Sequence, residues 1–344
     1  MPERGATKIA VVGGGGFRTP RLLYGLVQHG ARLALGEVTL YDPDRQRAEI
    51  MALIGRDLAA KEGSAVQVRV VDTVEDAVAG ARFVAITIRP GGEMGRVADE
   101  RVAMEVGVLG QETVGPGGFF LALRTIAALQ AILPRIRAAN PTAWIVNFAN
   151  PVGIVSEAAR RIGERRFIGV CDTPYHLKQE LAHWLRLPPE TVQVETVGLN
   201  HLGWFLAVRH GDTDLLTTIL DDFEAVREHV RPLSFFRPDE VRSVAALPTE
   251  YVYLYLHGPE VERRIRGTAL RGEQVAVRSR TFFERAALLA KGGEAAQLLS
   301  LYTDTLAARS NSYFQAETQT AVQRGLTAES ILATESYERV AIDT

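Results

Sequence analysis

The chain has 344 residues, is 47% hydrophobic and 23% charged, and carries a formal net charge of −2, which gives no reason to expect nucleic acid or a membrane surface as a partner. Its single cysteine excludes an intrachain disulfide framework and favours a reducing, cytoplasmic location. No apolar run approaches the ~20 residues of a membrane span, and the first one, 9–12, is too short for a signal peptide.

The first half of the chain alternates short β-branched runs with helical patterns, which is typical of parallel βαβ units. We expect a Rossmann-like, doubly wound α/β sheet with strands at 8–12, 37–41, 67–71, 83–88, 144–147 and 167–170. The helices expected between them are 20–28, 46–62, 73–79, 119–139 and 153–161. The glycine-rich and charged region 90–118 is interpreted as a long functional loop with a short helix.

After residue 192 the pattern changes to that of a mixed α+β lobe. Stretches 192–197 and 204–209 are typical of antiparallel strands. Helices are expected at 214–230, 238–244, 249–256 and 274–313. These patterns predict two domains, 1–171 for nucleotide binding and 172–344 for the substrate and a metal.

The first strand runs into four glycines and then a helix, a pattern that places backbone N–H groups at a helix N-terminus against a pyrophosphate. Asp42, at the end of the second strand, is placed to bind ribose hydroxyls and to favour NAD over NADP. The spacing is irregular, because Arg18 occupies the last glycine position, so a glycine-rich turn without a ligand is the alternative. The predicted cofactor residues are Gly13, Gly14, Gly15, Phe17, Arg18 and Asp42.

Two stretches about thirty residues apart carry the candidate metal ligands, Cys171 and His201. Cys171 ends a late parallel strand, where α/β sheets place ligands, and a thiolate with an imidazole suits a divalent metal. The alternatives are a small buried cysteine and a histidine satisfied within a strand. Asn150, which precedes a proline at another strand end, is predicted to hold sugar hydroxyls or to cap the next helix.

Several ordered motifs resemble glycoside hydrolase family 4, the NAD- and metal-dependent 6-phospho-glucosidases and their relatives. The motifs are GGGGFRTP (13–20), IRPGGEMGRVADE (88–100), GQETVGPGGFF (110–120), NFANPVGIVSEA (147–158), GVCDTP (169–174), GLNHLGW (198–204), LPTEYVYLY (247–255) and RGEQV (271–275). The opening motif and the leucine after His201 look most like the 6-phospho-β-glucosidase branch. The resemblance implies NAD and a divalent metal, Mn²⁺ preferred, as cofactors.

Carried over by position, the resemblance implies that Cys171 and His201 bind the metal and that Asn150 holds the substrate. Asp172 corresponds to the acid that helps the leaving group depart, and Tyr251 to the tyrosine base. The resemblance further implies a substrate pocket with an arginine on the sugar phosphate, Arg96, and with Gln111, Glu112 and Arg271.

The chemistry implied by the resemblance begins with hydride transfer from C3 of the sugar to NAD⁺, which gives a ketone. The metal polarises that ketone, Tyr251 removes the C2 proton and Asp172 assists elimination of the glycosidic oxygen. Water then adds and the hydride returns, so NAD is regenerated. The expected partner is a phosphorylated disaccharide or glucoside, and the expected assembly is a homodimer or homotetramer.

Other activities are also compatible with the motifs. They are a 6-phospho-α-glucosidase, an α-galactosidase or galacturonidase of the same family, a plain NAD-dependent 2-hydroxy-acid dehydrogenase, and a non-catalytic NAD-binding protein. The chain also ends soon after 335–341, whereas family members usually continue, so a further expectation is either a truncated chain or a C-terminally short, impaired member.

Overall fold

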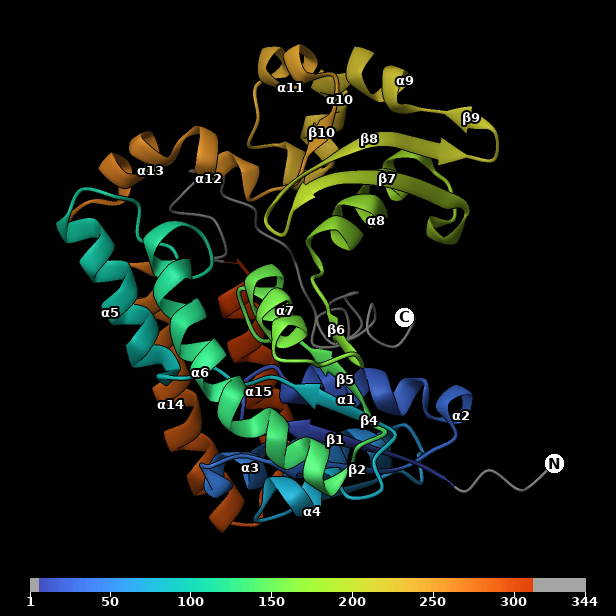
Figure 1. Ribbon diagram of the computed structural model, residues 1–344, viewed down its shortest axis with the longest axis vertical. Helices are drawn as coiled ribbons and strands as arrows, with labels where there is room; N and C mark the ends of the chain where they lie inside the picture. The colour runs from blue at the N-terminus through green and yellow to red at the C-terminus, as the bar shows by residue number, and fades with distance from the viewer. Residues whose placement is uncertain (1–5, 312–344) are drawn as a thin grey trace.

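The computed structural model describes residues 6–311, and its lower half is a sheet covered by helices on both faces (Figure 1). The sheet has six parallel strands in the order β3-β2-β1-β4-β5-β6. They are β1 (Thr7–Val12), β2 (Leu35–Tyr41), β3 (Gln67–Val70), β4 (Phe83–Ile86), β5 (Trp144–Asn147) and β6 (Phe167–Gly169). This is the doubly wound Rossmann order, so the predicted fold class is confirmed.

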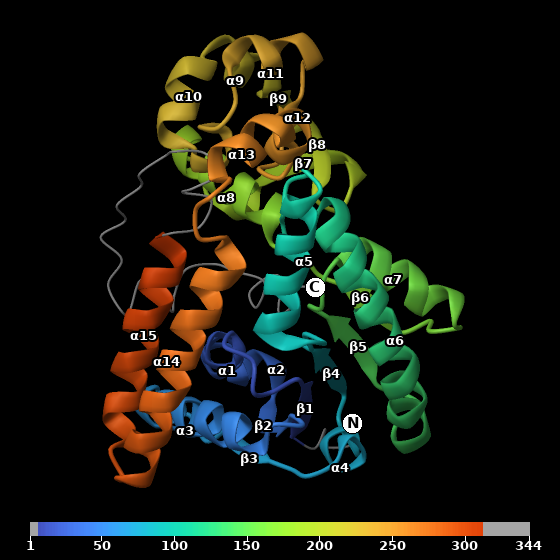
Figure 2. The same cartoon turned by 90° about the vertical axis from the view of Figure 1, so that its left-hand side faces the viewer.

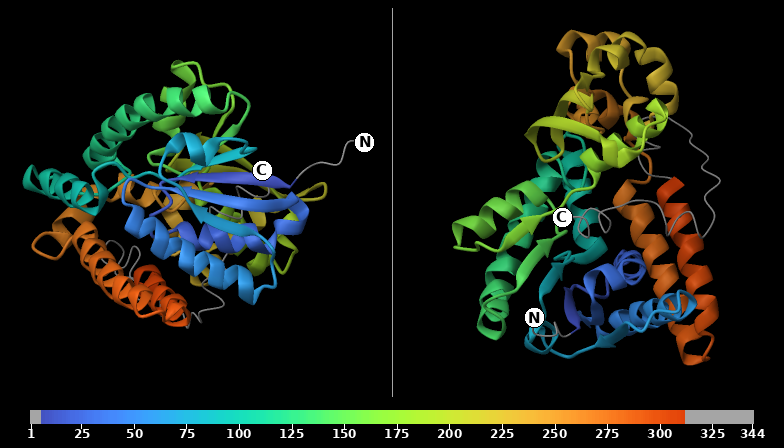
Figure 3. Two further views of the ribbon diagram at one scale, coloured as in Figure 1. Left: turned by 90° about the horizontal axis from the view of Figure 1, so that it is seen from below. Right: turned by 90° about the vertical axis from the view of Figure 1, so that its right-hand side faces the viewer.

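Alternate residues of the central strand β1 pack against helices on opposite faces of the sheet. Ile9 and Val11 lie in one core with α1 (Thr19–Gln28) and α3 (Arg45–Lys61). Ala10 and Val12 lie in another core, with helices α4 (Val74–Val78), α6 (Gly115–Ala139) and α7 (Val152–Arg161). Figure 3 shows α3 and α6 on the two sides of the sheet. A short helix, α2 (Gly30–Leu33), leads into β2.

Helix α6 corrects one expectation, because by length and composition alone it is apolar enough to cross a membrane. Within the apolar 18-residue stretch of this helix, 33% is buried inside the protein. The inward face includes Leu129, Leu133 and Ile136, which pack in the core with β1 and β4. A helix that covers a central sheet meets the same criteria as a membrane span, because it too buries a broad apolar face.

The region 90–118 contains a longer helix than the sequence predicted. Helix α5 (Gly92–Glu105) has 14 residues and begins where Gly91 and Gly92 both adopt positive φ, +85° and +58°. An ion pair between Arg96 and Glu100, one turn apart, supports its middle. The glycines therefore start this helix, although their density in the sequence resembles that of a loop.

The upper lobe is a small antiparallel sheet with helices, as predicted. Its strands β7 (Val192–Leu199), β8 (Leu202–His210) and β10 (Leu247–Pro248) pair in the order β10-β8-β7, and β9 (Thr213–Asp214) pairs with β8. Around them lie α8 (Thr173–Leu185), α9 (Leu216–Asp221), α10 (Phe223–His229), α11 (Pro238–Val244), α12 (Val252–Leu256) and α13 (Gly258–Ile265). Their shared core contains the fully buried rings of Phe205, Phe223 and Phe236.

Several helices of this half differ from the expectation. Helices α8 and α13 were not predicted, and the expected helix 214–230 is divided into α9 and α10 at Asp222. The expected helix 274–313 is likewise two helices, α14 (Arg271–Lys291) and α15 (Ala295–Asn311), and its last two residues lie outside the described part of the chain. Gly292 and Gly293, the latter at φ +74°, separate them because glycine readily adopts that backbone conformation.

Helices α14 and α15 lie beside α3 of the lower half, as Figure 2 shows. The ring of Phe17, just after the four glycines, lies 5.1 Å from both the Phe282 and the Tyr302 ring centroids. Met51 and Ile54 of α3 complete this core. Helices α14 and α15 therefore hold the glycine-rich turn in place through Phe17. The predicted domain boundary near residue 172 stays a prediction.

Candidate active site

The glycine-rich turn lies where the strand order reverses between β1 and β4, the usual ligand crevice of such sheets. The turn is closely packed: a Cβ atom on Gly13 would lie 2.8 Å from the Ile88 backbone nitrogen. The N–H groups of Gly13 and Gly14 both donate to the Tyr41 carbonyl, at 2.8 and 2.9 Å. The Gly15 N–H donates to Asp42 Oδ2 at 2.9 Å.

The expectation that the N–H groups of Gly13 and Gly15 point at a pyrophosphate is therefore wrong, because both have partners inside the protein. The helix start at Thr19 and Pro20 stays a predicted pyrophosphate contact, and Phe17 and Arg18, which directly precede α1, stay predicted cofactor residues. The other carboxylate oxygen of Asp42 accepts the Asp44 N–H at 2.9 Å. Burial raises the pKa of Asp42, and these two N–H donors oppose the rise. Asp42 thus joins the glycine turn to the end of β2.

Replacement of Asp42 by arginine should weaken NAD⁺ binding by about tenfold or more and make NADP⁺ relatively better. A carboxylate near the ribose repels a 2′-phosphate, whereas a guanidinium pairs with it. Titration of both cofactors by calorimetry measures the change. Asp44→Asn is the matched control, because asparagine keeps the cap that Asp44 Oδ1 gives to the Arg47 N–H at 3.1 Å. Unchanged NAD⁺ affinity in Asp42→Arg would remove Asp42 from the ribose site.

His201 lies in the tight turn between β7 and β8, where Leu199 pairs with Leu202. Its φ of +63° is a left-handed conformation that histidine tolerates better than most residues. Gly198 precedes the turn at φ +115°, and a Cβ atom there would lie 2.3 Å from the Leu202 carbonyl oxygen. Asn200 Oδ1 accepts the Gly153 N–H at 3.2 Å, which ties the turn to the start of α7. The hairpin motif thus fixes the position of the imidazole.

We expect Gly198→Ala to lower stability by about 1–3 kcal/mol and to weaken divalent-metal binding by displacing His201. Gly211→Ala is the matched control, because Gly211 also has positive φ, +56°, but has no atoms within 4 Å of its would-be Cβ. Thermal unfolding with and without Mn²⁺ measures both effects. Equal losses in the two variants would show that only the backbone angle matters.

The His201 ring is buried, with 5% of its surface exposed, and lies flat against Tyr251 at 3.9 Å between centroids and 9° between planes. Neither ring nitrogen has a hydrogen-bond partner in the described part of the chain. Burial lowers the pKa of His201 to about 4, so the imidazole is neutral at neutral pH. A neutral, buried ring with two unsatisfied nitrogens has the form that a metal ligand needs.

Cys171 follows β6 and is partly buried. Burial, and then the Asp172 carboxylate, raise the pKa of its thiol to about 11, while Thr173 and Asn200 interact with the sulfur and oppose the rise. Without a metal the side chain is therefore a thiol, and metal binding must release its proton. Asn200 connects Cys171 with the His201 turn, so the structure supports the predicted proximity of these two residues.

The donors present fit a divalent metal with open coordination positions. Residues 6–311 contain no group of three or more His, Cys, Asp or Glu side chains suited to a metal, which leaves Cys171 and His201 as the predicted pair. The Asn150 Oδ1 atom is also buried without a partner and is a further oxygen donor, to the metal or to a sugar. A site with few protein ligands leaves room for substrate oxygens, as in catalytic metal centres.

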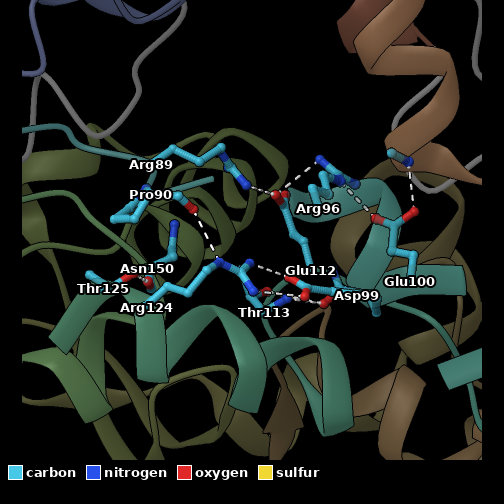
Figure 4. Close-up of polar contacts among 12 residues, drawn as sticks. Arg89, Pro90, Arg96, Asp99, Glu100, Glu112, Thr113, Arg124, Thr125 and Asn150 are labelled. Carbon is cyan, nitrogen blue, oxygen red and sulfur yellow. Dashed lines mark hydrogen bonds and ion pairs between the residues drawn. The ribbon is translucent and has the colours of Figure 1, made fainter. Parts of the chain in front are cut away.

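Figure 4 shows a cluster of arginines and glutamates near Asn150. Its member Glu112 interacts electrostatically with Arg18 after the glycine-rich turn and with His201. Glu112 Oε2 lies 2.6 Å from Arg89 and 3.0 Å from Arg96. Arg96 also contacts Glu100 at 2.7 Å, and Glu100 accepts the Gly272 N–H at 2.6 Å. Burial alone would raise the pKa of Glu112, but Arg89 and Arg96 hold it well below its usual range. Glu112 is therefore a carboxylate, and its charge also acts on His201.

The remaining predicted residues occupy different parts of this region. Gln111 Oε1 accepts the N–H groups of Thr113 and Val114, at 2.6 and 2.9 Å, so it shapes the turn before α6. Asp172 is the residue before α8, directly after Cys171. Arg271 begins α14 and donates to the Arg309 carbonyl at 2.7 Å. Each of these three roles in substrate binding or catalysis stays a prediction.

Sequence reasoning missed several polar residues of this region. Arg89 follows β4 at the carboxyl edge of the sheet, a position that could have identified it. Arg124 pairs with Asp99 and donates to the Pro90 carbonyl at 3.2 Å, which links α6 to α5. Arg309 comes from α15, and no local pattern connects it with the site.

Models of two family domains match most of the chain. The family 4 glycosyl hydrolase model matches residues 8–187, and the model of the family 4 glycosyl hydrolase C-terminal domain matches residues 196–338. The chain belongs to glycosyl hydrolase family 4. This membership agrees with the motifs around Cys171 and His201 and with the order of the strands.

Curated relatives in the family include the 6-phospho-beta-glucosidase BglT of Thermotoga maritima, 31% identical over 81% of this chain and 66% of its own. The 6-phospho-beta-glucosidase of Escherichia coli is 30% identical over 74% of this chain and 58% of its own. The maltose-6'-phosphate glucosidase of Bacillus subtilis is 29% identical over 69% of this chain and 52% of its own. The chain thus spans between about half and two thirds of these relatives' lengths.

Two solved structures with bound cofactors are similar to this one. The Thermotoga maritima 6-phospho-beta glucosidase with manganese, NAD⁺ and glucose-6-phosphate has a TM-score of 0.74 at 30% identity, over 82% of this chain and 68% of that one. A 6-phospho-alpha-glucosidase from gut microorganisms, with NAD and Mn²⁺, has a TM-score of 0.76 at 25% identity, over 89% of this chain and 75% of that one.

Proposed function

We propose that the protein hydrolyses 6-phospho-glucosides with NAD and a divalent metal, Mn²⁺ preferred, and that β-glucosides are its better substrates. The observation that carries this proposal is the buried His201 ring with two unsatisfied nitrogens, stacked on Tyr251 and connected through Asn200 to Cys171. A purely structural histidine would have found a hydrogen-bond partner at this depth. Relatives of both anomeric types support the substrate class.

Within this proposal the residues have separate tasks. Asp42, Phe17 and Arg18 hold NAD along the glycine-rich turn, and Cys171 and His201 hold the metal. NAD supplies reversible oxidation at C3 of the sugar, and the metal supplies polarisation of the resulting ketone. The remaining chemistry, proton transfer and substrate orientation, belongs to side chains of this chain.

Tyr251 accepts the C2 proton in this proposal. Its phenol interacts electrostatically with Arg96, and the positive charge of Arg96 can stabilise the Tyr251 phenolate. Asp172, beside the metal pair, assists departure of the glycosidic oxygen. Arg96 binds the sugar phosphate, Asn150 orients the sugar hydroxyls, and Gln111, Glu112 and Arg271 line the substrate pocket. These assignments are carried by position in the family motifs.

We further propose that the working protein is a cytoplasmic homodimer or homotetramer without nucleic acid or membrane partners. The small net charge of −2 supports the lack of nucleic-acid or membrane partners, and the phosphorylated substrates in the relatives' names support the cytoplasmic location. The domain division at residues 171 and 172 is retained as part of it, and it divides the predicted substrate and metal residues between the two domains.

Release of nitrophenol from the α- and β-anomers of nitrophenyl 6-phosphoglucoside, with NAD⁺ and Mn²⁺ present, tests the proposal. Because the hydride returns in each cycle, NADH absorbance should not accumulate while nitrophenol is released. The β-anomer should be hydrolysed faster. Stoichiometric NADH without nitrophenol would indicate a dehydrogenase instead, and faster α-anomer hydrolysis would reverse the anomer assignment.

A further inference from the structure

We infer that Asn200 is a positioning residue of the metal site: its side-chain amide donates a hydrogen bond to the Cys171 sulfur and holds that ligand beside His201. The inference rests on the proposed function, because it concerns the metal pair named there. None of the roles carried over from the family motifs falls on Asn200, which directly precedes His201 in the turn between β7 and β8.

The two ends of the Asn200 amide have different partners. Its Oδ1 atom accepts the Gly153 N–H, at the start of α7, at 3.2 Å. A second side-chain hydrogen bond joins Asn200 to Cys171. This bond lowers the pKa of the Cys171 thiol, which is the effect of a donor, so the amide nitrogen faces the sulfur. An amide that is held at its oxygen presents its N–H group in a fixed direction.

The backbone around Asn200 is held as firmly as its side chain. A Cβ atom on Gly153 would lie 3.0 Å from the Asn200 Cβ atom, so the close approach of α7 to the turn needs a glycine there. His201, the next residue, has a φ of +63°, and the pairing of Leu199 with Leu202 closes the turn around both residues. A shift of Asn200 would therefore move the histidine as well.

The Cys171 sulfur receives hydrogen bonds from two elements. Thr173, at the start of α8, contributes both its backbone and its side chain, and Asn200 contributes its amide from the hairpin. The bonds from Thr173 orient the sulfur relative to the helix that follows it, whereas the bond from Asn200 orients it relative to His201. Groups that hold metal ligands in this way typically change metal affinity by about 10–100-fold when they are removed.

Cobalt(II) is the probe for the test, because it binds divalent-metal sites and a thiolate ligand gives it a charge-transfer absorption band. Asn200→Leu removes both amide contacts at similar size. We expect its Co²⁺ affinity to fall at least about tenfold. The sulfur-to-cobalt band should move to longer wavelength, because a sulfur without its N–H donor releases electron density more easily. Thr196→Val, at an exposed position of β7, is the matched control and should change neither quantity.

Asn200→Asp separates the two contacts and also serves if the leucine variant does not fold. Its carboxylate can still accept the Gly153 N–H but has no N–H for the sulfur, so the band should move as in Asn200→Leu. A wild-type band in Asn200→Asp would show that only the link to α7 matters and would overturn the inference. Wild-type affinity and a wild-type band in Asn200→Leu would also overturn it.

The same spectra separate this inference from the proposed function. Wild-type turnover with unshifted bands in both Asn200 variants would contradict only the inference. Shifted bands in a protein that releases no nitrophenol would contradict only the proposed hydrolysis. Wild-type protein that binds Co²⁺ without a thiolate band would contradict the metal pair, and the role of Asn200 with it.

Discussion

Replacing His201 by alanine should lower turnover at least about a thousandfold while the protein remains folded and binds NAD⁺. Loss of a ligand removes the several kcal/mol of charge stabilisation that a bound metal provides, and each ~1.4 kcal/mol is a factor of ten in rate. Cys171→Ser should have the same effect. Both residues follow strand or turn ends instead of filling a core, so the stability cost should stay within about 0.5–3 kcal/mol.

The buried nitrogens of His201 also predict how the stability of the His201→Ala variant depends on the metal. In metal-free protein they are unsatisfied, which costs free energy, so His201→Ala should destabilise the apo form little. Added Mn²⁺ should raise the unfolding temperature of wild type but not of the variant. His210→Ala, at the exposed end of β8 that is remote from the His201 turn, is the control and should respond to Mn²⁺ like wild type. A His201 variant that unfolds outright would instead indicate an ordinary core residue.

Replacing Tyr251 by phenylalanine should slow exchange of the substrate C2 proton with solvent deuterium by about a hundredfold or more, the usual contribution of a positioned base. The substitution keeps the ring, and therefore the stacking on His201 at 3.9 Å, and removes only the phenolic oxygen. NAD⁺ and glucose 6-phosphate should bind as in wild type. Exchange is followed by nuclear magnetic resonance in deuterated buffer.

Tyr255→Phe is the matched control for this experiment. The three tyrosines of the motif alternate along the chain, but Tyr251 and Tyr253 are buried, at 5% and 6% exposure, whereas Tyr255 is 47% exposed. Because alternate residues lie on different sides of a helix, the three rings do not all share one buried face, and the last of them faces solvent. Wild-type exchange in Tyr251→Phe would assign the proton to another group and leave the family membership intact.

The lower half of the fold was predictable because its signals are local. The strand that ends before Gly13 and the carboxylate at Asp42 each follow from a short run of residues, and the β1–β2 pairing brings them together. The hairpin at His201 was predictable for the same reason, since glycines flank its turn. Gly292 and Gly293 were an equally local signal, but the helical pattern on both sides obscured it.

The arginine cluster could not be predicted, because long-range packing assembles it. The Glu100 carboxylate meets the Gly272 N–H across 172 residues of sequence. Arg309 reaches the site only because α15 packs on the Phe17 ring of the nucleotide-binding half. Sequence patterns identify Arg309 as one of many helical arginines, and only its tertiary contacts with Phe17 and Ser279 distinguish it from others such as Arg278.

The central claim, hydrolysis that needs both NAD and a divalent metal in this chain, is tested most directly by adding each cofactor back. Protein stripped of nucleotide and metal should release no nitrophenol from nitrophenyl 6-phospho-β-glucoside. NAD⁺ alone or Mn²⁺ alone should restore little activity, and the two together should restore it fully without net NADH. Undiminished release from the stripped protein, or no release with both cofactors present, would contradict the account.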